Sequence, residues 1–279
     1  MIIDFHTHIF FREIRQDREA YFDSEPDFAA LYRSSKSKLV GAGELIHSMD
    51  DHGLDKAVVF GFPWRSPALF KKHNDYVISM VDKYPDRLIG FASFDLFSPQ
   101  ASQETERCLG HGFSGIGEIA FYDSGINAAA LEQLEPVLSI CLQKEFPVLI
   151  HTNEPVGHHY PGKTPNTLAQ IYGLIKRFPE NKIVLAHWGG GIFFYAVMKK
   201  EVKDCLKNVY FDTAASPFVY DPAIYRFAIQ TAGIDKILFG SDFPLLKPSR
   251  YFEELSIAGL THDEKKSIQG ANAAELLKL

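Results

Sequence analysis

Cysteine is scarce in this sequence. Its 279 residues include only Cys108, Cys141 and Cys205, which lie far apart and form no CxxC pair. A disulfide framework needs an even set of cysteines, and a thiolate metal site needs paired ones. The cysteine pattern therefore excludes a disulfide-stapled fold and gives no indication of a thiolate-bound metal.

A run of basic residues and a long apolar segment are also missing. The formal net charge is −6, whereas nucleic acids and anionic membranes attract basic surfaces. The longest mainly apolar stretch, Ile183 to Met198, contains His187 and three glycines, and it falls short of the ~20 residues that a membrane span needs. The chain starts in a strand-like run without the features of a secretory signal. We therefore expect a cytoplasmic protein with no nucleic-acid or membrane partner.

No glycine-rich phosphate loop follows the first strand-like run, which argues against an open, doubly wound sheet. The sequence instead contains eight short apolar, β-branched or aromatic runs, and segments with helical spacing separate them. Eight such units predict an α/β protein with a (β/α)8 TIM barrel, whose usual size is about 250 residues. The runs are Ile2–His8, Lys56–Phe62, Leu88–Phe94, Phe113–Ile119, Pro147–Thr152, Lys182–Trp188, Val209–Thr213 and Lys236–Ser241.

Two segments do not fit the repeat. Residues 9–40 form a long, charged insertion rich in aromatic residues after the first strand, which would either shape a substrate pocket or act as a structural flap. Thr261 and Glu264 have the spacing of a capping box and predict a final helix within residues 261–279. No linker interrupts the chain, so we expect one domain over residues 1–279.

Ionisable side chains stand at the carboxyl ends of five predicted strands, where the active sites of TIM barrels lie. Because strand side chains alternate, the first two histidines face the same side. Imidazoles and carboxylates suit zinc and similar ions, and buried ionisable groups are costly unless they are paired or metal-bound. We therefore expect a divalent metal, zinc in the first place and one or two ions, held by His6, His8, Glu118, His151, His187 and Asp242.

Three motifs resemble those of the amidohydrolase superfamily, in particular its branch of TIM-barrel metal-dependent hydrolases that includes relatives of aminocarboxymuconate semialdehyde decarboxylase. They are Asp4-Phe-His6-Thr-His8, Ala186-His187-Trp-Gly-Gly190 and Gly240-Ser-Asp242-Phe-Pro244. The resemblance implies metal contacts for His6, His8 and His151. It implies that His187 binds a second metal or polarises the substrate, and that Asp242 contacts the metal and shuttles the proton of its bound water.

The fourth strand departs from many members of that superfamily, because Gly117-Glu118-Ile119 stands where they carry a carboxylated lysine. Gly115-Ile-Gly-Glu118-Ile119 is similar to the signature of TatD-type deoxyribonucleases, whose glutamate bridges two metals. Glu118 could therefore bridge two ions, bind one, or only orient a histidine that binds the metal.

The function expected on these grounds is metal-dependent hydrolysis of a small-molecule amide, ester or lactone, with Asp242 and His187 as catalytic residues. One alternative is a metal-dependent decarboxylase of an unsaturated or aromatic carboxylic acid, because the same residues suit either chemistry. A further alternative is a TatD-like phosphodiesterase, which Glu118 favours and the acidic net charge disfavours.

Substrate contacts are expected from four residues. Arg65 follows the second strand and could clamp a carboxylate or phosphate, with Trp64 beside it, although a surface salt bridge would explain it equally well. His159 lies in the loop after the fifth strand, and Asp212 ends the seventh and could orient a ligand or cap a loop. A homodimer is an open expectation for a barrel of this size.

Overall fold

The structure is a computed structural model that describes residues 1–279. Eight parallel strands follow one another in sequence order around a single sheet, as the eight apolar runs predicted. The strands are β1 (Ile3–His8), β2 (Lys56–Phe60), β3 (Leu88–Ala92), β4 (Gly115–Ile119), β5 (Val148–Ile150), β6 (Ile183–Leu185), β7 (Val209–Asp212) and β8 (Ile237–Leu238). The predicted (β/α)8 barrel is confirmed.

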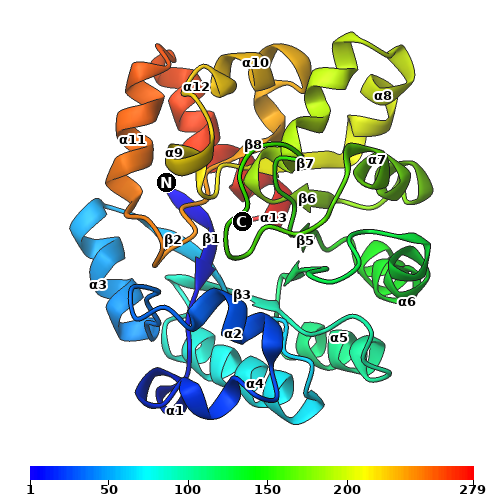
Figure 1. Cartoon of the computed structure of the whole chain (residues 1–279). Helices are drawn as coiled ribbons and strands as arrows, with labels where there is room; N and C mark the ends of the chain where they lie inside the picture. Colours follow the sequence, from blue (N-terminus) through cyan, green and yellow to red (C-terminus); the bar gives the residue numbers. More distant parts are fainter.

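Backbone hydrogen bonds between the first and last strand segments close the barrel. Phe5 N donates to Phe239 O and His8 N to Phe243 O, both at 2.8 Å, and Thr7 pairs with Phe243. In Figure 1 the strands lie at the centre and the helices surround them. The closure places His8, at the end of β1, beside the segment that carries Asp242.

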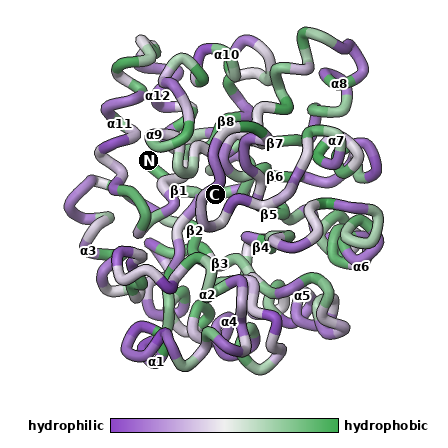
Figure 2. Tube along the Cα trace, in the orientation of Figure 1, coloured by the Kyte–Doolittle hydropathy of each residue, from purple (hydrophilic) through white to green (hydrophobic).

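The helices cover the outside of the barrel, and along them apolar and polar residues alternate (Figure 2). The Asn127 side chain accepts from Ala130 N and caps the helix that follows, and the predicted Thr261–Glu264 capping box is present. The helices are α1 (Arg12–Gln16), α2 (Pro26–Tyr32), α3 (Ala42–His52), α4 (Pro67–Lys83), α5 (Ala101–Gly110), α6 (Ala128–Lys144), α7 (Leu168–Arg177), α8 (Lys200–Cys205), α9 (Ser216–Val219), α10 (Ile224–Thr231), α11 (Pro248–Ile257), α12 (His262–Lys266) and α13 (Asn272–Leu277). None of them combines the length and hydropathy of a membrane span.

Two apolar clusters hold these layers together. The larger one lies between the strands and the outer helices. The smaller one, of 12 residues, comes from strand positions such as Phe5, Phe60 and Phe91 and from Ala273 and Leu276 of α13. Phe60 of this inner cluster contacts the ring of His6, so the cluster lies directly against the polar side chains at the carboxyl ends of the strands.

The insertion after β1 folds onto the barrel as helices α1 and α2. Phe28 of α2 packs against Phe62 and Trp64, with ring centroids 5.5 and 4.6 Å away. Phe28 therefore belongs to the hydrophobic core. Tyr32 is the last residue of α2, and its ring lies 6.1 Å from that of Phe62. The insertion is anchored by apolar packing and ends next to the residues that follow β2.

A buried histidine in this core should make stability depend on pH. His73 accepts a hydrogen bond from Trp64 Nε1 at 2.8 Å and therefore donates from Nε2 to Ile9 O at 2.7 Å. Burial lowers its pKa to about 4, against about 6.5 in the unfolded chain. As the pH falls, His73 takes up a proton in the unfolded chain before it does so in the folded protein. The contribution of His73 to the free energy of unfolding is therefore complete above pH 6.5 and is lost as the pH falls towards 4, by up to roughly 3 kcal/mol.

Chemical denaturation between pH 4 and 7 measures this effect in the wild type, in His73→Gln and in a control, His47→Gln, at an exposed histidine. We expect the free energy of unfolding to fall less steeply with decreasing pH in His73→Gln than in the other two. Equal slopes in all three proteins would show that His73 does not titrate as its surroundings indicate.

Candidate metal centre

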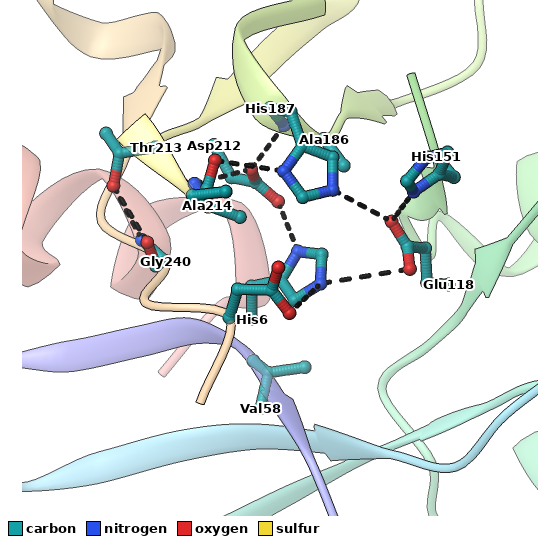
Figure 3. A network of polar contacts seen from close by, with 12 residues as sticks. His6, Val58, Glu118, His151, Ala186, His187, Asp212, Thr213, Ala214 and Gly240 are labelled. Atoms are coloured by element: carbon teal, nitrogen blue, oxygen red, sulfur yellow. Dashed lines mark hydrogen bonds and ion pairs between the residues drawn. The ribbon is translucent and has the colours of Figure 1, made fainter. Parts of the chain in front are cut away.

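The six predicted metal ligands meet at the carboxyl ends of the strands, and Figure 3 shows Glu118 lying between His6, His151 and His187. His6 Nε2 is 3.3 Å from His8 Nε2, and Asp242 Oδ1 is 3.4 Å from His8 Nε2. Three groups of side chains each place their donor atoms within 4.8 Å of one another: His6, His8 and Glu118; His6, His187 and Asp242; Glu118, His151 and His187.

An irregularity in β1 lets both Phe5 and His6 face the interior of the barrel. The register with β2 pairs Asp4 with Ala57 and Thr7 with Val59, so β1 has one extra residue between these positions. Phe5 contacts Phe91 and His6 contacts Phe60, both inside the barrel. The bulge thus turns two consecutive side chains inward, and His6 ends above the apolar cluster.

Backbone carbonyls and one carboxylate fix the orientation of the histidine rings. His8 Nδ1 lies 3.1 Å from Gly61 O, and His187 Nδ1 lies 2.9 Å from Ala214 O. A carbonyl oxygen only accepts, so in the neutral rings Nδ1 carries the proton and Nε2 has a free lone pair. His6 Nδ1 likewise lies 2.8 Å from Asp212 Oδ2. Three Nε2 lone pairs therefore point into the site.

These lone pairs face one another at short range. His6 Nε2 and His8 Nε2, both without a proton in the neutral rings, are 3.3 Å apart. His151 donates from Nε2 to Gly162 O at 3.0 Å, so its Nδ1 lone pair faces Glu118 Oε1 at 2.8 Å. Facing acceptors repel unless a cation or a proton lies between them. The donor set therefore fits a divalent metal ion.

The pKa values show the same demand for positive charge. Burial lowers the pKa of His6 and of His187, but carboxylates outweigh burial and raise them to about 10 and about 9. Burial acts to raise the pKa of Asp242, yet the histidines bring it down to about 2. Glu118 follows the same pattern, with its pKa well below the usual value. Ionised carboxylates in a buried site require a compensating cation.

Asp212 has a place that the sequence did not predict. Its side chain is fully buried, and besides His6 Nδ1 it accepts from His187 N at 2.8 Å and from Ala214 N at 3.0 Å (Figure 3). Its oxygens are occupied by these groups, so the predicted substrate contact is corrected. Asp212 instead positions His6 and the start of the segment that carries His187.

A second buried carboxylate, also missed by sequence reasoning, holds the segment around Asp242. Asp4 accepts from Ser241 N at 2.9 Å and from the Ser241 hydroxyl, and Ser241 Oγ accepts from Phe243 N at 3.1 Å. Tyr251 donates to Ser241 O at 2.7 Å. Asp242 itself has a left-handed backbone, φ 57°. The flanking contacts therefore hold Asp242 in the conformation that turns its carboxylate to the histidines.

Two of the remaining predicted substrate residues, Arg65 and Trp64, are engaged elsewhere. Arg65 forms salt bridges with Asp27 and Asp123, 2.8 and 2.5 Å long, which is the surface ion pair considered as its alternative. Trp64 has no exposed surface and packs in the core, so its predicted substrate contact is corrected as well. His159 is exposed in the loop after β5, and its substrate role stays a prediction.

The glycines after β6 serve close packing. Gly189, Gly190 and Gly191 all have positive φ. A Cβ on Gly190 would lie 2.5 Å from Asn153 O, and one on Gly189 would lie 2.8 Å from Phe211. Only glycine fits both the backbone conformation and the space. These glycines therefore allow tight packing beside His187.

Comparison with known proteins establishes the family. A family model described as Amidohydrolase matches residues 3–279. The chain belongs to this amidohydrolase family. The sequence is 23% identical over 284 residues to a gamma-resorcylate decarboxylase of Polaromonas sp. (strain JS666 / ATCC BAA-500), covering 84% of this chain and 86% of that protein.

Solved structures have the same fold. A 5-carboxyvanillate decarboxylase from Novosphingobium aromaticivorans, with bound manganese and 3-methoxy-4-hydroxy-5-nitrobenzoic acid, superposes with a TM-score of 0.80 and 18% identity. That match covers 100% of this chain and 97% of the other. A putative amidohydrolase from Staphylococcus aureus gives a TM-score of 0.74 and 21% identity over 100% and 99% of the two chains.

These relatives correct the expected reaction. The prediction of a hydrolase was wrong: four curated relatives that match this chain are gamma-resorcylate decarboxylases, and several matching structures are decarboxylases of aromatic acids. They favour the decarboxylase, which the sequence offered only as an alternative. The comparisons leave the homodimer and the cytoplasmic location as predictions.

Proposed function

We propose that this chain is a metal-dependent decarboxylase of an aromatic carboxylic acid. The observation that carries the proposal is the cluster of facing lone pairs and buried carboxylates around His6, at the carboxyl end of the barrel. The relatives supply the reaction class, since they are decarboxylases of gamma-resorcylate and 5-carboxyvanillate, which are both aromatic acids. Fold alone would not choose a reaction.

The six clustered side chains would hold one divalent ion, manganese or zinc, because His6, Glu118 and His187 each belong to two of the three donor groups. When bound, the ion supplies positive charge that attracts the carboxylate of the substrate. Manganese accompanies three matching decarboxylase structures, whereas imidazole-rich sites also suit zinc. The contacts of Asp212, Gly61 O and Ala214 O with Nδ1 leave Nε2 of His6, His8 and His187 free, so these three atoms would be available to the ion.

Decarboxylation replaces a carboxylate on a ring carbon by a proton, so the chain must deliver one proton for each CO2 released. Asp242 is the residue for this step, because its Oδ1 lies at the centre and the Asp4–Ser241 contacts fix its backbone. Asp242 would take up a proton from solvent and pass it to the ring carbon as the bond to CO2 breaks. His187, in the same donor group, would hold the substrate carboxylate.

A panel of substrates tests this proposal. We expect purified protein loaded with manganese or zinc to convert at least one substituted benzoic acid to the corresponding arene and CO2, and to lose that activity when a chelator removes the ion. Amide, lactone and phosphodiester substrates run in parallel cover the other chemistries of this fold. Turnover of those substrates with no acid converted would overturn the proposal.

The metal content of Glu118 variants separates the roles considered for that residue. We expect one ion per chain in the wild type. In Glu118→Gln we expect the dissociation constant for the metal to be 10–100-fold larger, because the amide lacks the negative charge that faces His151 Nδ1 and His187 Nε2. Metal analysis and calorimetric titration measure both quantities. Two ions per wild-type chain, falling in the variant, would instead show that Glu118 bridges a binuclear site.

A further inference from the structure

Two tyrosines from separate parts of the chain share one aromatic neighbour beside the metal centre. Tyr32 ends α2 of the insertion, and Tyr122 follows β4. The ring of Phe62 lies 6.1 Å from Tyr32, nearly perpendicular, and 6.2 Å from Tyr122, stacked at 11°. Phe62 itself follows Gly61, whose carbonyl orients His8. The three rings thus form one wall next to the residues that turn His8 inward.

Both phenol groups lie near the charged residues of the centre. The ring of Tyr122 is 5.9 Å from that of His151. Burial raises the pKa of Tyr32 and of Tyr122, and the carboxylates of Glu118 and Asp242 raise both further. Each hydroxyl therefore keeps its proton and can donate a hydrogen bond.

Neither hydroxyl has a hydrogen-bond partner within the protein, whereas the hydroxyls of six other tyrosines do. The phenol oxygens are not completely buried either, because the one side-chain polar atom that is both buried and unpartnered is Arg15 Nε. A tyrosine that is largely buried usually places its hydroxyl against a partner. The two free donors beside the centre are therefore available to a ligand.

The position of Tyr32 is held from outside the site. Arg18 donates to Tyr32 O at 3.3 Å and to Ser37 O at 2.6 Å, which ties the end of α2 to the segment that follows it. The ring of Tyr32 is also packed by Phe28 and Phe10, with centroids 4.8 and 5.4 Å away. A donor that is held in place binds its acceptor with little loss of side-chain entropy.

We propose that the hydroxyls of Tyr32 and Tyr122 recognise an oxygen substituent on the aromatic ring of the substrate. The preferred acid would then be a hydroxylated benzoate, with its carboxylate at the histidines and its ring beside Phe62. This inference rests on the proposed function and deepens it. A site that offers hydrogen-bond donors to a substituent discriminates strongly against the analogue that lacks it. It would also give the insertion after β1 the substrate-shaping role considered for it.

Tyr32→Phe, Tyr122→Phe and the double variant test the proposal, because they remove only the hydroxyl and keep the ring packing. Tyr84→Phe is the matched control, since that tyrosine follows α4 at the amino end of β3 and also lacks a hydroxyl partner. We expect each single variant to raise KM for a hydroxylated benzoate about tenfold. The value of kcat should change less than threefold, and the preference over unsubstituted benzoate should shrink. Tyr84→Phe should match the wild type.

Calorimetric binding of the hydroxylated and the unsubstituted acid to metal-loaded protein provides a readout that needs no turnover. If the wild type prefers the hydroxylated acid and the two variants lose that preference, the recognition is supported even where no CO2 is released, in which case only the decarboxylase proposal fails. If the variants decarboxylate and bind both acids like the wild type, the recognition is overturned and the decarboxylase stands. Wild-type protein that does not distinguish the two acids would overturn it as well.

Discussion

Asp242→Asn should lower kcat for decarboxylation by roughly 1,000-fold, since positioned acid–base groups contribute about 10²–10⁴-fold. The amide matches the carboxylate in shape and can still lie near His8, but it cannot carry a proton to the ring carbon. The backbone of Asp242 is held by its neighbours, with Asp242 N donating to His6 O at 2.9 Å. The fold should therefore survive the substitution.

The thermal midpoint and the metal content of Asp242→Asn need to be measured beside its activity. Asp123→Asn serves as the control, because Asp123 is exposed and pairs only with Arg65. A variant that keeps its ion and its midpoint but loses turnover places the proton transfer on Asp242. Activity within tenfold of the wild type, with the metal retained, would remove Asp242 from the chemical step.

Asp212→Ala should weaken metal binding by 10–100-fold and lower the free energy of unfolding by about 3 kcal/mol. The substitution leaves the Nδ1 proton of His6 and the backbone amides of His187 and Ala214 without their acceptor in a fully buried position. The ring of His6 then loses the contact that fixes its tautomer. Both effects should appear before any substrate is added.

Metal titration and denaturant unfolding of Asp212→Ala distinguish this role from the substrate contact that the sequence suggested. The matched control is Asp204→Ala, at an exposed aspartate in α8. A contact with substrate alone would raise KM and leave metal affinity and stability unchanged. That result would contradict the positioning role and restore the original prediction.

The barrel could be predicted from sequence because its signal is local. Each strand appears as a short apolar run, and the carboxyl ends of parallel strands lie at the same end of the barrel regardless of the conformation of the loops. The same reasoning brought His6, Glu118 and Asp242 together, since each stands at or just after the end of a strand. Orientation within the site depended on a bulge in β1 that no pattern in the sequence announces.

Contacts between distant segments were beyond that reasoning. Asp212 was assigned to substrate because it ends a strand, and Trp64 because it stands beside Arg65. Burial and hydrogen bonding instead place Asp212 against His6 and Trp64 in the core. The position of Tyr32 depends on how the insertion packs on Phe62. The reaction itself was misjudged, because the same ligands serve hydrolysis and decarboxylation. Only the relatives favoured the second.

Proton NMR of the reaction in D2O tests the central claim most directly. Metal-loaded protein is incubated with a hydroxylated benzoic acid, and the arene product is isolated. The account predicts one deuterium on the ring carbon that carried the carboxylate, with one CO2 released per arene and no product in the presence of a chelator. Untouched acids, together with metal-dependent cleavage of an amide or lactone that takes up oxygen from water, would contradict it.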